Sequence, residues 1–148
     1  MGDVSLWSAK GAFTTVCFAV STFPWNEGFG GMVTVGSKIL PPCWSYENVV
    51  GTSGPVSSAT TRSYYGPNTG THFIYTYYGT TTWVFMPNMQ LTAGTSYDFS
   101  FYMMNKVVTS PVNFLMDVAY GSNNTSAGMT NVLATGIVCN NSTYSLFK

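Results

Sequence analysis

Apolar and polar residues alternate with a period of two in several short stretches of the chain, which is the pattern of half-buried strands. No window of a dozen residues repeats apolar positions at helical spacing between capping residues. We therefore expect an all-β protein. The stretches that alternate are THFIYTYY (71–78), TTWVFM (81–86), SYDFSFYM (96–103) and NFLMDVAY (113–120).

Turn-forming residues separate these strands. Many short strands divided by Gly, Pro, Asn and Ser are typical of an antiparallel sandwich or barrel. We expect the stretch 49–70 to be a long polar loop, with or without a short strand inside it, and a loop of this length in a compact domain is usually functional or decorative. The other connecting stretches are MPNMQLTAGT (86–95), NKVVTSP (105–111) and YGSNNTSAG (120–128).

Charged side chains are scarce in this chain, at 7% of 148 residues, against roughly 25% in ordinary soluble domains. Five Lys and Arg residues balance five Asp and Glu residues, so we expect no nucleic acid or anionic membrane partner. The apolar runs are too short for membrane insertion. The N-terminus lacks the charged start and continuous apolar core of a signal peptide, so we expect any export signal to lie upstream.

Four stretches, in this order, resemble the choice-of-anchor J domains, which are close to the cleaved-adhesin and MAM-like jelly rolls of secreted Bacteroidetes proteins. Together they cover residues 23–133. The resemblance implies an antiparallel β-sandwich of jelly-roll type in a secreted or cell-surface protein. The stretches are FPWNEGFGG (23–31), LPPCW (40–44), WVFMPNMQLTAGTSYDFSF (83–101) and MDVAYGSNNTSAGMTNVL (116–133).

The two ends of the chain depart from this resemblance. Residues 1–16 resemble the last strand of a fibronectin type III-like module, which often precedes such a domain. Residues 17–148 then form the jelly roll, but the closing strand of the family is absent after TYSLFK. We therefore expect a domain truncated at its C-terminus, with exposed sheet edges that favour aggregation.

The three cysteines are Cys17, Cys43 and Cys139. The resemblance implies a disulfide between Cys17 and Cys43, and two buried free thiols are the alternative. The partner of Cys139 stays open. Because His72 is the only histidine and no Cys/His cluster occurs, a zinc site is not expected. Within the LPPCW stretch, the two prolines end a strand, and we expect Trp44 to anchor the core.

A calcium ion is the one cofactor that the resemblance implies. Relatives hold it with acidic residues of the opening and closing strands, and Glu27 occupies the first acidic position. Gly30 stands where the family has its second acid. Because calcium takes six to eight oxygen ligands, usually with several carboxylates, a solvated or hydrogen-bonded Glu27 is the alternative interpretation.

Aromatic side chains are the candidate ligand contacts. Their flat faces stack on sugar rings when polar groups stand nearby. Tyr75 and Tyr77 share an alternating face with Phe73, so we expect them in the core, whereas tyrosines in the loop 49–70 are expected to be exposed. The predicted carbohydrate-binding residues are Arg62, Tyr64, Tyr65, Tyr78 and Tyr102.

Catalysis has little support in the sequence. General acid–base chemistry needs two positioned titratable groups, and the acidic residues lie far apart along the chain. His72 has no neighbouring nucleophile motif. We therefore expect no enzyme, although a small glycan-active hydrolase with two carboxylates in one cleft is a third alternative. The acidic residues are Asp3, Glu27, Glu47, Asp98 and Asp117.

The expected function is a non-catalytic adhesion or carbohydrate-binding module of a secreted, multidomain surface protein. Its partners would be a glycan or an extracellular surface protein, together with neighbouring domains of the same chain. The main alternative is a structural spacer without a specific ligand. Sugar binding predicts exposed aromatic rings on one concave face, and a spacer predicts that the same rings are buried.

Overall fold

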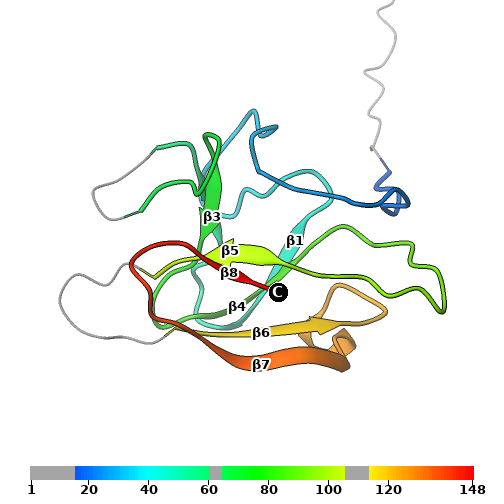
Figure 1. The fold of residues 1–148 in the computed structure, drawn as a ribbon. Helices are drawn as coiled ribbons and strands as arrows, with labels where there is room; N and C mark the ends of the chain where they lie inside the picture. Colours follow the sequence, from blue (N-terminus) through cyan, green and yellow to red (C-terminus); the bar gives the residue numbers. More distant parts are fainter. Residues whose placement is uncertain (1–15, 61–64, 106–113) are drawn as a thin grey trace, which may run out of the picture.

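A computed structural model describes residues 16–60, 65–105 and 114–148 of the chain (Figure 1). Within these ranges the regular structure is all strand, apart from one 3-10 turn, η1 (Ser126–Gly128). The strands are β1 (Ser45–Val50), β2 (Val56–Ser58), β3 (Phe73–Tyr75), β4 (Thr81–Phe85), β5 (Phe101–Met103), β6 (Phe114–Tyr120), β7 (Asn131–Cys139) and β8 (Ser145–Phe147).

The strands pair antiparallel in four two-stranded sheets, β1–β4, β2–β3, β5–β8 and β6–β7. The pairs are nested along the chain, because β2–β3 lies between β1 and β4 in sequence and β6–β7 lies between β5 and β8. In Figure 1, β6 and β7 run side by side along the lower edge, and β3 stands on the opposite side. The all-β class is confirmed, and the jelly-roll connectivity stays a prediction.

The four predicted strands differ in how well they match. The stretches 81–86 and 113–120 match β4 and β6 closely, whereas 71–78 is strand only at β3 and 96–103 only at β5. The polar loop predicted over 49–70 contains the end of β1 and all of β2. The structure adds β1, β7 and β8, which the alternation of residues did not indicate.

The core is small and centres on β2. Pro55 and Ser57 are almost completely buried. Ser57 lies against Gly36, because its Oγ accepts a hydrogen bond from the Gly36 N–H and its own N–H donates to the Gly36 carbonyl. This pairing holds the segment 36–40 beside β2. The buried apolar side chains in the described ranges are Met32, Val56, Phe73, Phe85 and Cys139.

The N-terminal described segment is held to the body of the fold at two places. A disulfide joins Cys17 to Cys43, with their Cα atoms 5.4 Å apart. Val20 forms a parallel bridge to Met89, with backbone hydrogen bonds of 2.8 Å to Asn88 and Gln90. The disulfide is therefore the pairing that the resemblance implied, and Cys139 is a buried free thiol.

Two expectations lie at the limits of this description. Residues 1–15, which were assigned to a preceding module, lie outside the described residues, so the division at residues 16 and 17 stays a prediction. Among the residues that are described, no helix is long and apolar enough to cross a bilayer.

Candidate functional site

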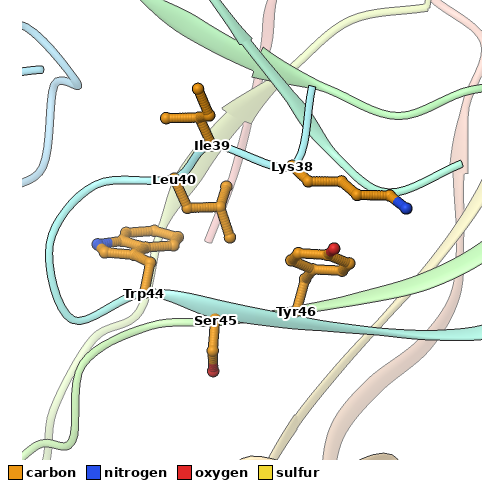
Figure 2. A pocket seen from close by; sticks show the side chains of 6 residues that line it. All are labelled: Lys38, Ile39, Leu40, Trp44, Ser45 and Tyr46. Atoms are coloured by element: carbon orange, nitrogen blue, oxygen red, sulfur yellow. The ribbon is translucent and has the colours of Figure 1, made fainter. Parts of the chain in front are cut away.

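A hollow of about 490 Å³ lies where the chain enters β1. Residues 38–40 form one wall and residues 44–46 form the other (Figure 2). Leu40 and Trp44 lie at one end, and Lys38 and Tyr46 lie at the other. Its volume falls in the roughly 300–1,000 Å³ range of small-molecule sites. The residues that line this Trp44 hollow are Lys38, Ile39, Leu40, Trp44, Ser45 and Tyr46.

A tight turn at Pro41–Trp44 brings the two walls together. The Trp44 N–H donates to the Pro41 carbonyl at 3.1 Å, and Cys43 adopts a left-handed φ of 70°. Pro42 and Cys43 thus occupy the central positions of a turn whose third residue needs positive φ, as in type II turns. Glycine usually fills that position, and here the disulfide to Cys17 fixes a cysteine in it.

A second turn of similar form positions Lys38. The Ile39 N–H donates to the Gly36 carbonyl at 3.3 Å, and Lys38 has a left-handed φ of 62°. The Lys38 N–H donates to the Pro55 carbonyl at 2.8 Å, beside the bridge between Ser37 and Val56. Contacts with β2 therefore hold Lys38 in a backbone conformation that is uncommon outside glycine.

Trp44 joins the hollow to an aromatic cluster. Phe29 meets its ring edge-on at a centroid distance of 5.6 Å, and Trp25 lies 6.5 Å away. Its Nε1 is buried without a hydrogen-bond partner among the described residues. In Figure 2 this nitrogen points away from the Lys38 end of the hollow. Packing against Phe29 and Trp25 therefore orients the indole, although Trp44 is half-buried and lies outside the buried core in which it was expected.

Tyr46 forms the floor of the hollow below Lys38 (Figure 2). It pairs with Val84 across the β1–β4 ladder. A Cβ added to Gly54 would lie 2.9 Å from both the Lys38 Cγ and the Tyr46 Cε2. The absence of a side chain at Gly54 thus lets the Lys38 stem and the Tyr46 ring approach each other.

The described members of the predicted carbohydrate-binding set, Tyr65, Tyr78 and Tyr102, are not among the residues that line this hollow. Arg62 and Tyr64 lie outside the described residues. Tyr65 is half-buried and packs on Phe73 and Tyr75, at centroid distances of 5.8 and 5.1 Å. Tyr78 and Tyr102 are exposed, at 76% and 56% of their surface.

Tyr75 and Tyr77 are both expected in the core. Tyr75 is half-buried, whereas Tyr77 is 45% exposed, so the prediction is wrong for Tyr77. Their rings meet edge-on at 5.6 Å. Burial, together with hydrogen bonds to the hydroxyls of Tyr77 and Tyr65, raises the pKa of Tyr75 to about 12. This hydroxyl therefore stays protonated at physiological pH.

Each described acidic side chain forms a hydrogen bond or an ion pair with another residue of the chain. Glu27 Oε1 accepts from the Phe29 N–H at 2.6 Å, and Glu47 Oε2 accepts from the Ser126 N–H at 2.5 Å. Asp98 forms an exposed ion pair with Lys148 at 2.8 Å. Asp117 accepts hydrogen bonds within the β6–β7 hairpin. Asp3 lies outside the described residues.

The described surroundings of Glu27 supply few ligands for a calcium ion. Within the described ranges, no three Asp, Glu, His or Cys side chains come together as metal ligands, and calcium needs six to eight oxygens. The Glu27 carboxylate instead closes its own turn through the Phe29 N–H. Its role as a calcium ligand stays a prediction.

The sequence indicated Trp44 only as a core anchor, and it did not indicate the hollow that Trp44 lines. The signal was present in the Pro-Pro-Cys-Trp turn and in Gly36, both of which reverse the chain. A comparison of the chain with protein-family models, curated proteins and solved structures finds no match.

Proposed function

We propose that the chain is a non-catalytic carbohydrate-binding module and that it binds a saccharide in the Trp44 hollow. The observation that carries the proposal is the hollow itself, in which two aromatic side chains, Trp44 and Tyr46, share one wall. Aromatic faces contact the CH surfaces of sugar rings, and a few polar groups at the rim bind hydroxyls. Each wall is held by its own hydrogen-bonded turn.

Rigidity of the walls supports binding, because a site ordered in advance loses less entropy when a ligand enters. The disulfide fixes the turn before Trp44. Ser45 turns its hydroxyl away from the hollow (Figure 2), where Asn124 donates to it at 3.1 Å. The polar groups left to a ligand are therefore the Tyr46 hydroxyl and the Lys38 ammonium.

We place this module in a secreted or cell-surface protein, where a glycan or an extracellular surface protein is its adhesion partner. The disulfide supports this location, because such bonds persist in oxidising compartments. Neighbouring domains of the same chain would carry any further activity. A hydrolase would need two carboxylates in one cleft, and the six side chains that line the Trp44 hollow include no carboxylate.

Substitution of Trp44 tests the proposal. The purified chain is titrated with neutral and anionic oligosaccharides by calorimetry. We expect Trp44→Ala to weaken binding by at least tenfold, because a buried aromatic contact at a binding site contributes about 1–2 kcal/mol or more. Trp44→Phe keeps a ring against Phe29 and Trp25, so it should retain a cooperative melt and intermediate affinity.

Tyr78→Ala and Tyr102→Ala are the matched controls, because both side chains are exposed and lie outside the hollow. We expect neither to change affinity. If these substitutions abolish binding while Trp44→Ala does not, the site lies at the tyrosines predicted from the sequence. If no oligosaccharide binds to the folded chain, the proposal fails and the spacer alternative is favoured.

A further inference from the structure

Lys38 is the charged group of the Trp44 hollow. It is the one charged residue among the six that line the hollow. Its ammonium forms no ion pair or hydrogen bond with a described residue. The ion pair within the described ranges joins Lys148 to Asp98. The described carboxylates of Glu27, Glu47 and Asp117 are engaged elsewhere. No described protein anion therefore neutralises this end of the hollow.

The backbone places this charge at a strained position. Lys38 occupies the third position of the turn Gly36–Ile39 with a φ of 62°, where glycine or asparagine is favoured. Such residues persist where the surroundings fix them, and they cluster at functional sites. The hydrogen bond to Pro55 and the close approach at Gly54 supply that fixation here.

The Lys38 side chain has a defined direction as well as a charge. Figure 2 shows the Lys38 stem passing above the Tyr46 ring, with the ammonium at the far end from Leu40 and Trp44. A saccharide ring stacked on Trp44 would thus direct its neighbouring substituent toward the Lys38 ammonium. A negatively charged substituent gains a charge-assisted hydrogen bond at that place, and a neutral one gains an ordinary hydrogen bond.

We infer that Lys38 makes the Trp44 hollow selective for saccharides that carry a negatively charged group, either a carboxylate or a sulfate. This inference rests on the proposed function, because it names the class of sugar that the same site takes. Trp44 provides affinity for the sugar ring, and Lys38 provides preference for a negatively charged substituent on that sugar. Raising the salt concentration should reduce this preference, because salt screens exposed charges.

The test compares each anionic oligosaccharide with its neutral form. Oligogalacturonate is paired with its methyl ester, and a sulfated galactan oligosaccharide, which has no carboxylates, is paired with its desulfated form, so that the two sources of charge are separated. We expect the wild-type chain to prefer at least one anionic form by about fivefold, which corresponds to about 1 kcal/mol for an exposed charge pair.

Two substitutions at Lys38 assign this preference to the side chain. Lys38→Asn removes the charge and suits the left-handed backbone, so the variant should melt at or above the wild-type temperature and yet lose the preference. Lys38→Arg retains the charge and should retain the preference. A purely structural lysine would give the opposite result, with a lowered melting temperature and unchanged selectivity.

The outcomes separate this inference from the proposed function. If Lys38→Asn binds the anionic forms as tightly as wild type while Trp44→Ala abolishes binding, the hollow binds sugar but Lys38 does not select it. Equal affinity of the wild-type chain for the charged and neutral member of both pairs overturns the inference in the same way. If no oligosaccharide binds, both proposals fail together.

Discussion

Three carboxylates among the described residues, those of Glu27, Glu47 and Asp117, accept hydrogen bonds from backbone N–H groups. Asp117 lies where β6 and β7 lose register, opposite Gly136, which has a left-handed φ of 64°. Its Oδ1 accepts from the Gly136 N–H at 2.7 Å and from the Thr135 hydroxyl at 2.8 Å. These two bonds, the backbone one foremost, lower the pKa of Asp117.

This lowered pKa predicts a pH dependence of stability. Because the pKa is below its ordinary value of 3.8 in the folded chain, the carboxylate stabilises the fold above that pH and loses this effect as pH falls through the folded value. We expect Asp117→Asn to lower the melting temperature by a few degrees at pH 7, because the amide oxygen still accepts both hydrogen bonds but lacks the charge that strengthens them. The difference between the two chains should shrink as pH falls below 3.8.

Thermal melts of both chains across this pH range provide the measurement. Asp98→Asn is the control, because the Asp98 carboxylate is exposed and pairs only with Lys148 among the described residues. An unchanged difference between wild type and Asp117→Asn from pH 7 to pH 2 would show that the charge of Asp117 has no role in the hairpin.

At the scale of elements, the disulfide and the turn at Cys43 act together. The bridge joins residues separated by 26 positions, which corresponds to about 3 kcal/mol in the chain-entropy description. We expect Cys17→Ser with Cys43→Ser to reduce the free energy of unfolding by about that amount, measured by urea denaturation. A reductant should reduce the stability of the wild type alone.

A paired variant separates the covalent link from the backbone conformation. Cys17→Ser with Cys43→Gly also lacks the disulfide, but glycine adopts the φ of 70° at this turn without strain. This variant should be about 1 kcal/mol more stable than the double serine variant. Equal stability of the two would mean that the turn opens once the bridge is gone.

The sequence predicted elements best where β-branched and aromatic residues follow one another. The run 81–86 has Thr, Trp, Val and Phe in succession, and Phe85 is buried at the end of β4, along which exposure does not alternate. In β7 the neighbours Val132 and Leu133 are both exposed and a bulge shifts the register, so no alternation marks the strand. β1 begins directly after a turn, and its polar residues interrupt the alternation of apolar and polar positions by which a strand is recognised.

The candidate site was only partly predictable for a related reason. Trp44 stands out in the sequence because a proline pair and a cysteine precede it. Lys38 carries no comparable signal, because its position depends on a positive φ and on contacts with Gly54 and Pro55. These contacts join segments that are distant along the chain, and local patterns do not report them.

At the scale of the whole molecule, apolar side chains are exposed over the β6–β7 sheet. Leu115 and Val138 stand opposite each other in the register and are 69% and 46% exposed. Exposed apolar surface of this kind favours association between molecules. We therefore expect the chain to self-associate as its concentration rises, as the sequence-based expectation of exposed sheet edges also implied.

Charges at this pair should prevent the association. Leu115→Glu with Val138→Lys places opposite charges across the ladder, where such pairs are tolerated or favourable. Sedimentation velocity should then show a monomer at concentrations at which the wild type associates, with a melting temperature close to that of the wild type. Association that persists unchanged in this variant would place the contact elsewhere on the molecule.

The most direct test of the central claim is to map a bound saccharide onto the intact chain by NMR. The indole N–H resonance of Trp44 is assigned by its absence from the Trp44→Phe spectrum, and oligogalacturonate and neutral oligosaccharides are then added. We expect a bound saccharide to shift the Trp44 resonance and to leave that of Trp83, outside the hollow, unchanged. A saccharide that binds the folded chain without shifting Trp44 would contradict it.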